Sequence, residues 1–96
     1  MITKPGKRDQ AIEAMLESGK LTADNPDSLL ALVYADAKDA NVIWVEDIWT
    51  SKAAHDSALQ NPQIRVYVDQ VIPLLEGMPD QTEVVLKGGK GLRLDA

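Results

Sequence analysis

The first apolar positions of the chain predict a very short strand followed by a helix. Residues 1–3 suit the end of a strand, and the Pro5-Gly6 dipeptide predicts the turn that stops it. From residue 7 to about residue 18, apolar side chains recur at helical spacing and form one stripe, made of Ala11, Ile12, Met15 and Leu16. Gly19 is expected to end this helix, because glycine is common just after the last helical turn.

Two apolar runs, residues 29–34 and 42–49, flank a polar connection and predict an antiparallel hairpin. Side chains alternate along a strand, so the second run divides into two sets: Val42, Trp44, Glu46 and Ile48 on one face, and Ile43, Val45, Asp47 and Trp49 on the other. Both sets are mostly apolar, so both faces are expected to be covered. Helices of the same chain can cover one face, which leaves the other for a partner.

The second half of the chain predicts two helices and a last strand. Ser51 is expected to cap a short helix, and Asn61 and Pro62 are expected to begin the next one. Gly77 is expected to close that second helix. Residues 82–87 read as a final short strand.

The resulting order is β-α-β-β-α-β, which predicts an α+β, ferredoxin-like fold with helices on one face of an antiparallel sheet. The length of 96 residues suits a single domain over residues 1–96. The first strand is much shorter than this fold normally has.

Charge and composition exclude several classes of partner and site. With 15 acidic against 10 basic residues, the net charge of −5 repels nucleic acid and anionic membranes, so neither is expected to bind. No apolar run is long enough to span a bilayer, and a cytoplasmic location is expected. The absence of cysteine excludes disulfides and thiolate chemistry, and a single histidine makes a metal site unexpected.

The lone histidine, His55, is also a poor candidate for a Ser-His-Asp triad. Its sequence neighbour is Asp56, and adjacent residues on a helix are not expected to face each other.

Five residues between positions 46 and 67 nevertheless combine types that suit a flat, acidic aromatic ligand: Glu46, Trp49, His55, Arg65 and Tyr67. Indole and phenol rings give stacking area, a guanidinium can hold a phenolate, and an imidazole can move a proton near neutral pH. Each also has a purely structural interpretation. Trp49 and Trp44 can be core, His55 a surface residue, Glu46 an ion-pair partner across a subunit boundary, and Arg65 with Tyr67 a solvated helix face.

Several segments, in this order, resemble the antibiotic biosynthesis monooxygenase family. They are the Lys-Pro-Gly opening at residues 4–9, the strand Trp-Val-Glu-Asp-Ile-Trp at 44–49, the helix segment Ala-His-Asp-Ser-Ala-Leu at 54–59, Pro-Leu-Leu at 73–75, and the tail at 88–92. The resemblance implies a subunit that dimerises through its sheets into an α+β barrel. It also implies oxygenation of a quinol or hydroxyaromatic compound by O2, without metal or cofactor.

The resemblance also implies roles for particular residues. We expect His55, Trp49 and Glu46 to be catalytic, and we expect four residues to bind substrate: Arg65 (from charge alone), Tyr67, Trp44 and Tyr34. The helix position where many relatives carry histidine is Ala58 here, so haem degradation and isomerase activity fit less well. A non-catalytic module that binds a small ligand or dimerises is the alternative on the same fold.

Overall fold

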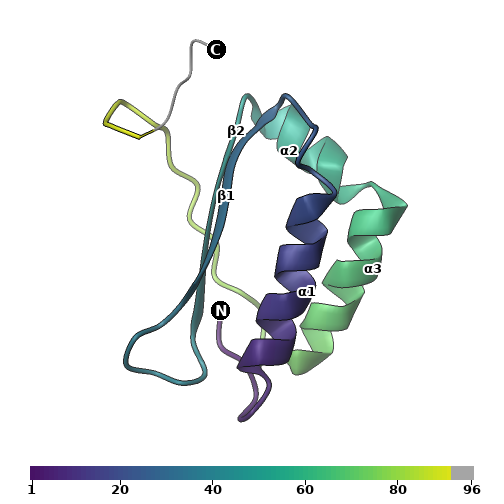
Figure 1. Cartoon of the computed structure of the whole chain (residues 1–96), viewed down its shortest axis with the longest axis vertical. Coiled ribbons are helices and arrows are strands. Elements are labelled where there is room, and N and C mark those ends of the chain that lie inside the picture. The colour runs from purple at the N-terminus through teal and green to yellow at the C-terminus, as the bar shows by residue number, and fades with distance from the viewer. Residues whose placement is uncertain (92–96) are drawn as a thin grey trace.

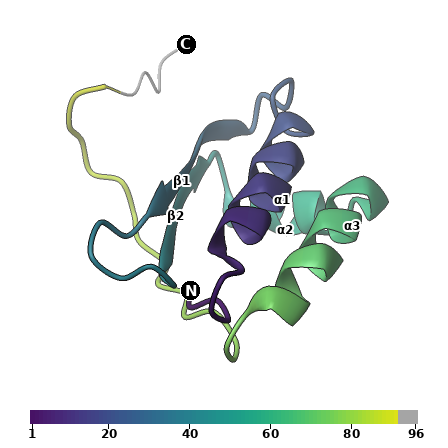
Figure 2. The ribbon, with the colours of Figure 1, turned by 60° about the horizontal axis from the view of Figure 1, so that its bottom comes forward.

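The computed structural model describes residues 1–91 and places all the helices on one face of a two-stranded hairpin (Figures 1 and 2). The elements follow in the order α1 (Arg8–Lys20), β1 (Ser28–Ala35), β2 (Ile43–Trp49), α2 (Lys52–Leu59), α3 (Pro62–Val71) and a 3-10 turn η1 (Ile72–Leu74). Leu92, the last residue of the family-like tail, lies outside the described residues.

The hairpin of β1 and β2 is antiparallel, as predicted, and its register pairs Val33 with Val45 and Tyr34 with Trp44. A residue of α1 binds the backbone of the connection between the two strands. Arg8 Nη1 donates to the backbone oxygens of Asp39 at 2.7 Å, Asp36 at 3.1 Å and Val42 at 3.4 Å. One guanidinium therefore ties the turn of the hairpin to the beginning of α1.

Local capping residues begin the helices that follow the hairpin. The Ser51 hydroxyl accepts the Ala54 N–H at 3.1 Å, and the Asn61 side chain accepts the Gln63 N–H at 2.9 Å, with Pro62 in the first turn of α3. Both caps were expected from the sequence, because each satisfies an amide that the first helical turn leaves unpaired.

Two predicted helix ends are wrong. α1 continues through Gly19, and Leu21 is its C-cap in an ordinary right-handed conformation, so no left-handed glycine is needed there. α3 ends at Val71 rather than at Gly77, and the chain tightens into η1 around Pro73. Proline lacks the N–H that would continue the α-helix, which explains the earlier end.

The predicted first strand is present only as two isolated bridges. Ile2 pairs antiparallel with Val42 of the β2 side, and Thr3 pairs antiparallel with Leu75, which follows the last helical turn. Thr3 is buried, and its hydroxyl donates to the Asn41 oxygen at 3.1 Å. Residues 1–3 therefore lie between β2 and the chain after η1, which is where the first strand of a ferredoxin-like sheet belongs.

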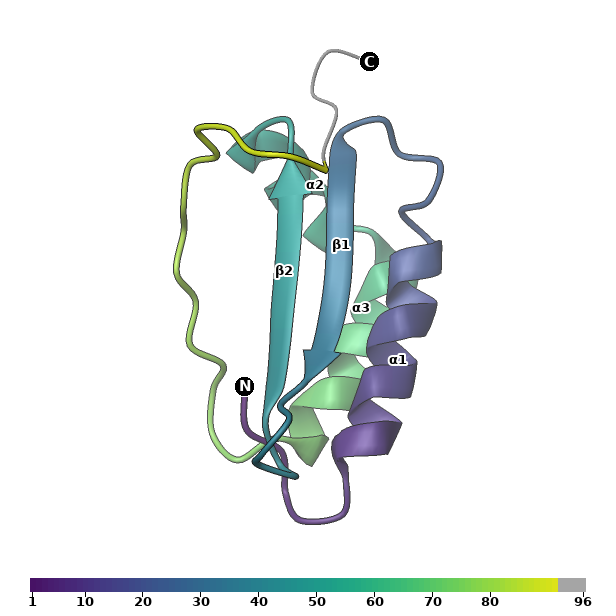
Figure 3. The ribbon, with the colours of Figure 1, turned by 60° about the vertical axis from the view of Figure 1, so that its left-hand side comes forward.

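The prediction of a final strand at residues 82–87 is wrong for the single chain. These residues have no strand partner within residues 1–91, and they run alongside β2 without pairing to it (Figure 3). Valine-rich composition favours an extended chain, but a strand also needs a neighbour to accept and donate its backbone hydrogen bonds.

The core lies between the helices and the inner face of the hairpin. Ala14, Val71 and Leu75 form one buried cluster, against which Met1, Met15 and Tyr67 pack. Ile43 of β2 is completely buried, and Ala11 and Ile64 are buried on the helices. No helix within the described part of the chain is long and apolar enough to cross a membrane.

Candidate functional site

Asp47, Trp49 and His55 meet where β2 passes into α2. Asp47 and Trp49 are two residues apart, so the alternation of the strand places both side chains on the face toward the helices. The Ser51 cap begins α2 directly after β2, and His55 lies in its first full turn, with its N–H bonded to the Ser51 oxygen at 3.3 Å. The short link between strand and helix therefore determines how the imidazole faces the strand.

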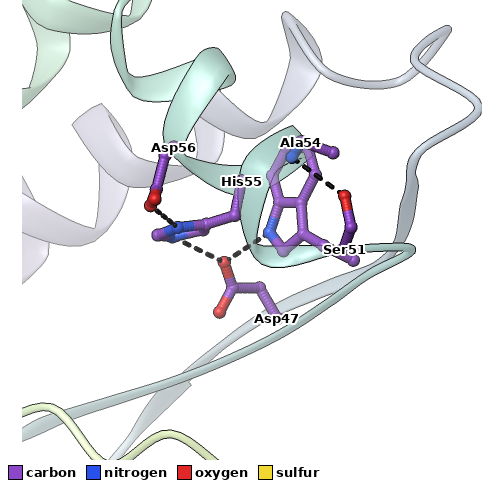
Figure 4. A network of polar contacts seen from close by, with 6 residues as sticks. Asp47, Ser51, Ala54, His55 and Asp56 are labelled. Atoms are coloured by element: carbon purple, nitrogen blue, oxygen red, sulfur yellow. Dashed lines mark hydrogen bonds and ion pairs between the residues drawn. The ribbon is translucent and has the colours of Figure 1, made fainter.

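The three side chains form one polar group around the Asp47 carboxylate (Figure 4). Trp49 Nε1 donates to Asp47 Oδ2 at 2.8 Å, and His55 Nε2 lies 3.8 Å from the same oxygen. The indole and imidazole rings meet edge to face, with centroids 5.7 Å apart and planes at 77°. The exposed fractions of the His55 and Asp47 side chains are 34% and 42%, so the group is open to solvent on one side.

Asp56 holds the other nitrogen of the imidazole, since its Oδ1 lies 3.1 Å from His55 Nδ1. An ionised carboxylate can only accept a hydrogen bond, so in a neutral imidazole this contact places the proton on Nδ1. Nε2 then carries the free lone pair. That atom can take a proton from a ligand, and the resulting cation would lie 3.8 Å from Asp47.

Two features of this group differ from the sequence-based expectation. Asp56 does contact His55, although neighbours on a helix were not expected to meet. Both side chains leave an exposed helix of two turns and can bend toward each other, because no packing holds them apart. Asp47 was not predicted as a site residue, although its position on the same face as Trp49 was a usable signal.

Glu46, Tyr34 and Trp44 lie on the opposite face of the hairpin, away from the helices. Tyr34 OH donates to Glu46 Oε1 at 3.1 Å, and Trp44 Nε1 donates to Asp36 Oδ2 at 2.9 Å. Partial desolvation, and then the hydrogen bond to Glu46, raise the pKa of Tyr34 above its usual value. Glu46 was named as a catalytic candidate together with Trp49 and His55, but the structure places it away from them, because alternate residues of one strand point to opposite sides.

Arg65 and Tyr67 lie on α3 and take no part in either group. Arg65 is exposed, and Tyr67 packs against the buried cluster of Ala14, Val71 and Leu75. Tyr67 also borders two hollows at the helices. One, of about 180 Å³, is lined by Gln10, Glu13, Ala14, Glu17, Tyr67 and Gln70, and the other, of about 330 Å³, by Leu21, Gln63, Val66 and Tyr67.

These hollows are open depressions lined by no imidazole or indole, so they offer fewer groups that could bind or deprotonate an aromatic ligand than the group at Asp47 does. Within residues 1–91, no cluster of three or more histidine, cysteine or acidic side chains is arranged to hold a metal ion.

Comparison with known proteins agrees with the order of elements. The family model of the antibiotic biosynthesis monooxygenases matches residues 1–70. A crystal structure of a protein assigned to the antibiotic biosynthesis monooxygenases, from Chloroflexus aurantiacus J-10-fl, superposes with a TM-score of 0.84 at 29% sequence identity. The match covers 96% of this chain and 91% of that one. No match was found among curated proteins. On its matched residues and its α+β, ferredoxin-like architecture, the chain belongs to the antibiotic biosynthesis monooxygenase family.

Proposed function

We propose that this protein is a monooxygenase that oxidises a quinol or another hydroxyaromatic compound with O2, without metal or cofactor, at the group formed by Asp47, Trp49 and His55. Membership of the family supports monooxygenase chemistry. The observation that carries the proposal is the imidazole of His55, whose Nδ1 faces Asp56 at 3.1 Å while Nε2 faces Asp47 and the solvent.

His55 is the proposed base. Its Nε2 removes the proton of a phenolic hydroxyl, and the carboxylate of Asp47 attracts the imidazolium that forms. The Trp49 ring packs edge to face with the imidazole and holds it in place, and the indole offers a flat apolar surface for the substrate.

The phenolate is rich enough in electrons to reduce O2 directly. In the overall reaction, a ring C–H and the phenolic O–H are replaced by the two C=O groups of a quinone. One oxygen atom of O2 becomes the new carbonyl oxygen and the other leaves as water. The substrate supplies all the electrons, so no separate reductant is required.

Glu46, Tyr34 and Trp44 are better placed for a dimer than for the substrate of their own chain. Tyr34 is 44% exposed and Trp44 59% exposed, and Leu32 lies beside them on the same face. We propose that this outer face packs on its equivalent in a second copy, because so much exposed apolar surface is unusual for a monomer. Arg65 and Tyr67 are proposed to contact substrate only from α3, outside the group at Asp47.

Oxygen uptake with a panel of hydroxyaromatic compounds, in air and under anaerobic conditions, tests the catalytic proposal. Replacement of His55 by glutamine is expected to lower kcat about 10²–10⁴-fold, the usual contribution of a general base. Lys52→Ala, on the exposed side of the same helix, is the matched control and should leave the rate unchanged. The enzyme proposal is abandoned if compounds bind, as followed by tryptophan fluorescence, and none of them is turned over with O2.

A non-catalytic, ligand-binding module is the second candidate. It is favoured by the openness of the group, since the His55 and Asp47 side chains keep about a third or more of their surface exposed. This candidate predicts that His55→Gln weakens ligand binding and that O2 consumption is never seen. A Soret band characteristic of protein-bound haem on adding haemin would instead indicate haem binding.

A further inference from the structure

The group at Asp47 presents two hydrogen-bond acceptors side by side. Asp56 places the His55 proton on Nδ1, so Nε2 carries a lone pair, and this atom lies 3.8 Å from Asp47 Oδ2 (Figure 4). That distance is too long for a hydrogen bond, and both atoms can only accept one. Two neighbouring acceptors that do not satisfy each other suit a ligand that brings two donors.

The carboxylate of Asp47 has capacity left for such a ligand. Trp49 Nε1 donates to its Oδ2 at 2.8 Å, and within residues 1–91 this indole is the one group that donates to the carboxylate. An ionised carboxylate has about four acceptor positions. The Asp47 side chain is 42% exposed, so a ligand can reach it. The indole therefore fixes the carboxylate beside the imidazole and leaves most of its acceptor positions for the ligand.

The spacing of the two acceptors selects how the donors of the ligand are arranged. Hydroxyls on adjacent carbons of an aromatic ring point the same way, and their oxygens are closer together than the 3.8 Å between Nε2 and Oδ2. Each O–H can therefore reach its own acceptor at an ordinary hydrogen-bond length. Hydroxyls on opposite carbons of the ring point away from each other, so only one of them can reach the group.

The charge of the group restricts the other substituents of the ligand. Asp47 and Asp56 lie on either side of the imidazole, and within residues 1–91 neither carboxylate forms an ion pair with a lysine or an arginine. The indole N–H of Trp49 is already bonded to Asp47. An anionic substituent beside the hydroxyls would therefore be repelled by two carboxylates, with no lysine or arginine paired to them to balance its charge.

We propose that the group at Asp47 selects an uncharged aromatic ortho-diol, whose two adjacent hydroxyls donate to His55 Nε2 and to the Asp47 carboxylate. The inference rests on the proposed function and deepens it by naming the class of hydroxyaromatic substrate. Oxidation turns one of the two hydroxyls into a carbonyl, which can only accept a hydrogen bond. The quinone product therefore loses one of its bonds to the group, which favours its release.

Calorimetric titration without O2 tests the selection, because it measures binding apart from turnover. Catechol and its para isomer hydroquinone differ only in the position of one hydroxyl. Catechol is expected to bind at least about fivefold more tightly, the factor that one additional net hydrogen bond contributes. 3,4-Dihydroxybenzoate is expected to bind at least about fivefold more weakly than its methyl ester at low salt, and this difference should shrink at high salt.

Variants of Asp47 assign both preferences to its carboxylate. Asp47→Ala removes the acceptor and the charge, so it should lose the preference for catechol and the preference for the ester. Asp47→Asn keeps the shape of the side chain without the charge, and it should lose the preference for the ester. Asp69→Ala and Asp69→Asn are the matched controls. They make the same changes in net charge at an exposed position of α3, and they should keep both preferences.

The inference is overturned if catechol and hydroquinone bind the natural chain equally, or if neither binds. It is also overturned if the Asp47 and Asp69 variants keep the preferences to the same extent. A preference for catechol without oxygen uptake in air contradicts the proposed oxygenase and leaves the selection of ortho-diols standing. Oxygen uptake without that preference contradicts the selection and leaves the oxygenase standing.

Discussion

Both carboxylate oxygens of Asp36 accept hydrogen bonds within the hairpin. Its carboxylate accepts hydrogen bonds from Trp44 Nε1 and from the N–H groups of Lys38 and Asp39, each at 2.9 Å. The indole hydrogen bond, followed by the two amides, lowers the pKa of Asp36 to about 2. The ionised form therefore holds the hairpin turn in shape, and it also fixes the orientation of an exposed tryptophan.

The stability of the protein should depend on this ionisation. A carboxyl whose pKa falls from 3.8 to about 2 on folding contributes stability above the higher value, and that contribution is lost as the pH falls through the lower one. We therefore expect the difference in melting temperature between the natural chain and Asp36→Asn to be full near neutral pH. It should shrink between pH 3.8 and about 2.

Thermal unfolding followed by circular dichroism over this range measures the effect. Asp24→Asn, an exposed change in the loop before β1, is the control and should show no such dependence. A difference for Asp36→Asn that is constant at every pH would mean that the charge is not what stabilises the turn.

At the scale of elements, the two faces of β2 carry residues with different roles. Its inner residues supply the buried Ile43 and the group at Asp47, and its outer residues supply the exposed Trp44 and the pair of Glu46 with Tyr34. The buried position should dominate the free energy of unfolding, because a removed side chain leaves a cavity that the helices cannot fill.

Ile43→Ala is expected to lower the free energy of unfolding by about 2–5 kcal/mol, as buried isoleucines usually do. Ile72→Ala makes the same chemical change at a position that is 46% exposed, and it should have a clearly smaller effect. Urea unfolding of both variants compares them, and equal losses would show that Ile43 is not a core residue in solution.

Features set by neighbouring residues were predictable from the sequence, and features set by distant contacts were not. The caps at Ser51 and Asn61 and the alternation of β2 follow from local chemistry, and the structure confirms them. The absence of a strand at residues 82–87 depends instead on what lies nearby in space. For the candidate site, the sequence predicted Trp49 and His55, but the contacts of Asp47 and Asp56 with them could be seen only in the structure.

At the scale of the whole molecule, the two faces of the hairpin are unequal. Helices cover the inner face, while Leu32, Tyr34 and Trp44 on the outer face are between 42% and 59% exposed. A dimer through this face would give the sheet a second covered side, which explains why both sets of residues are apolar.

Leu32→Asp is therefore expected to convert the protein from dimer to monomer, since it places an unpaired charge in the centre of the proposed interface. Light scattering at several concentrations gives the mass. Leu16→Asp, on α1 and 52% exposed, is the matched control and should stay dimeric. Equal masses for the two variants would place the interface elsewhere.

The bridge between Thr3 and Leu75 also bears on how the molecule assembles and opens. It closes a loop that contains nearly all the other elements, so its contacts carry the largest loss of chain entropy and should form last. The hairpin, with its short connection, forms early. The amides of Lys4 and Glu76, which donate across the bridge, should then exchange with solvent through small openings while β1 and β2 stay paired. The first and last parts of the fold are therefore expected to open together, without unfolding of the hairpin.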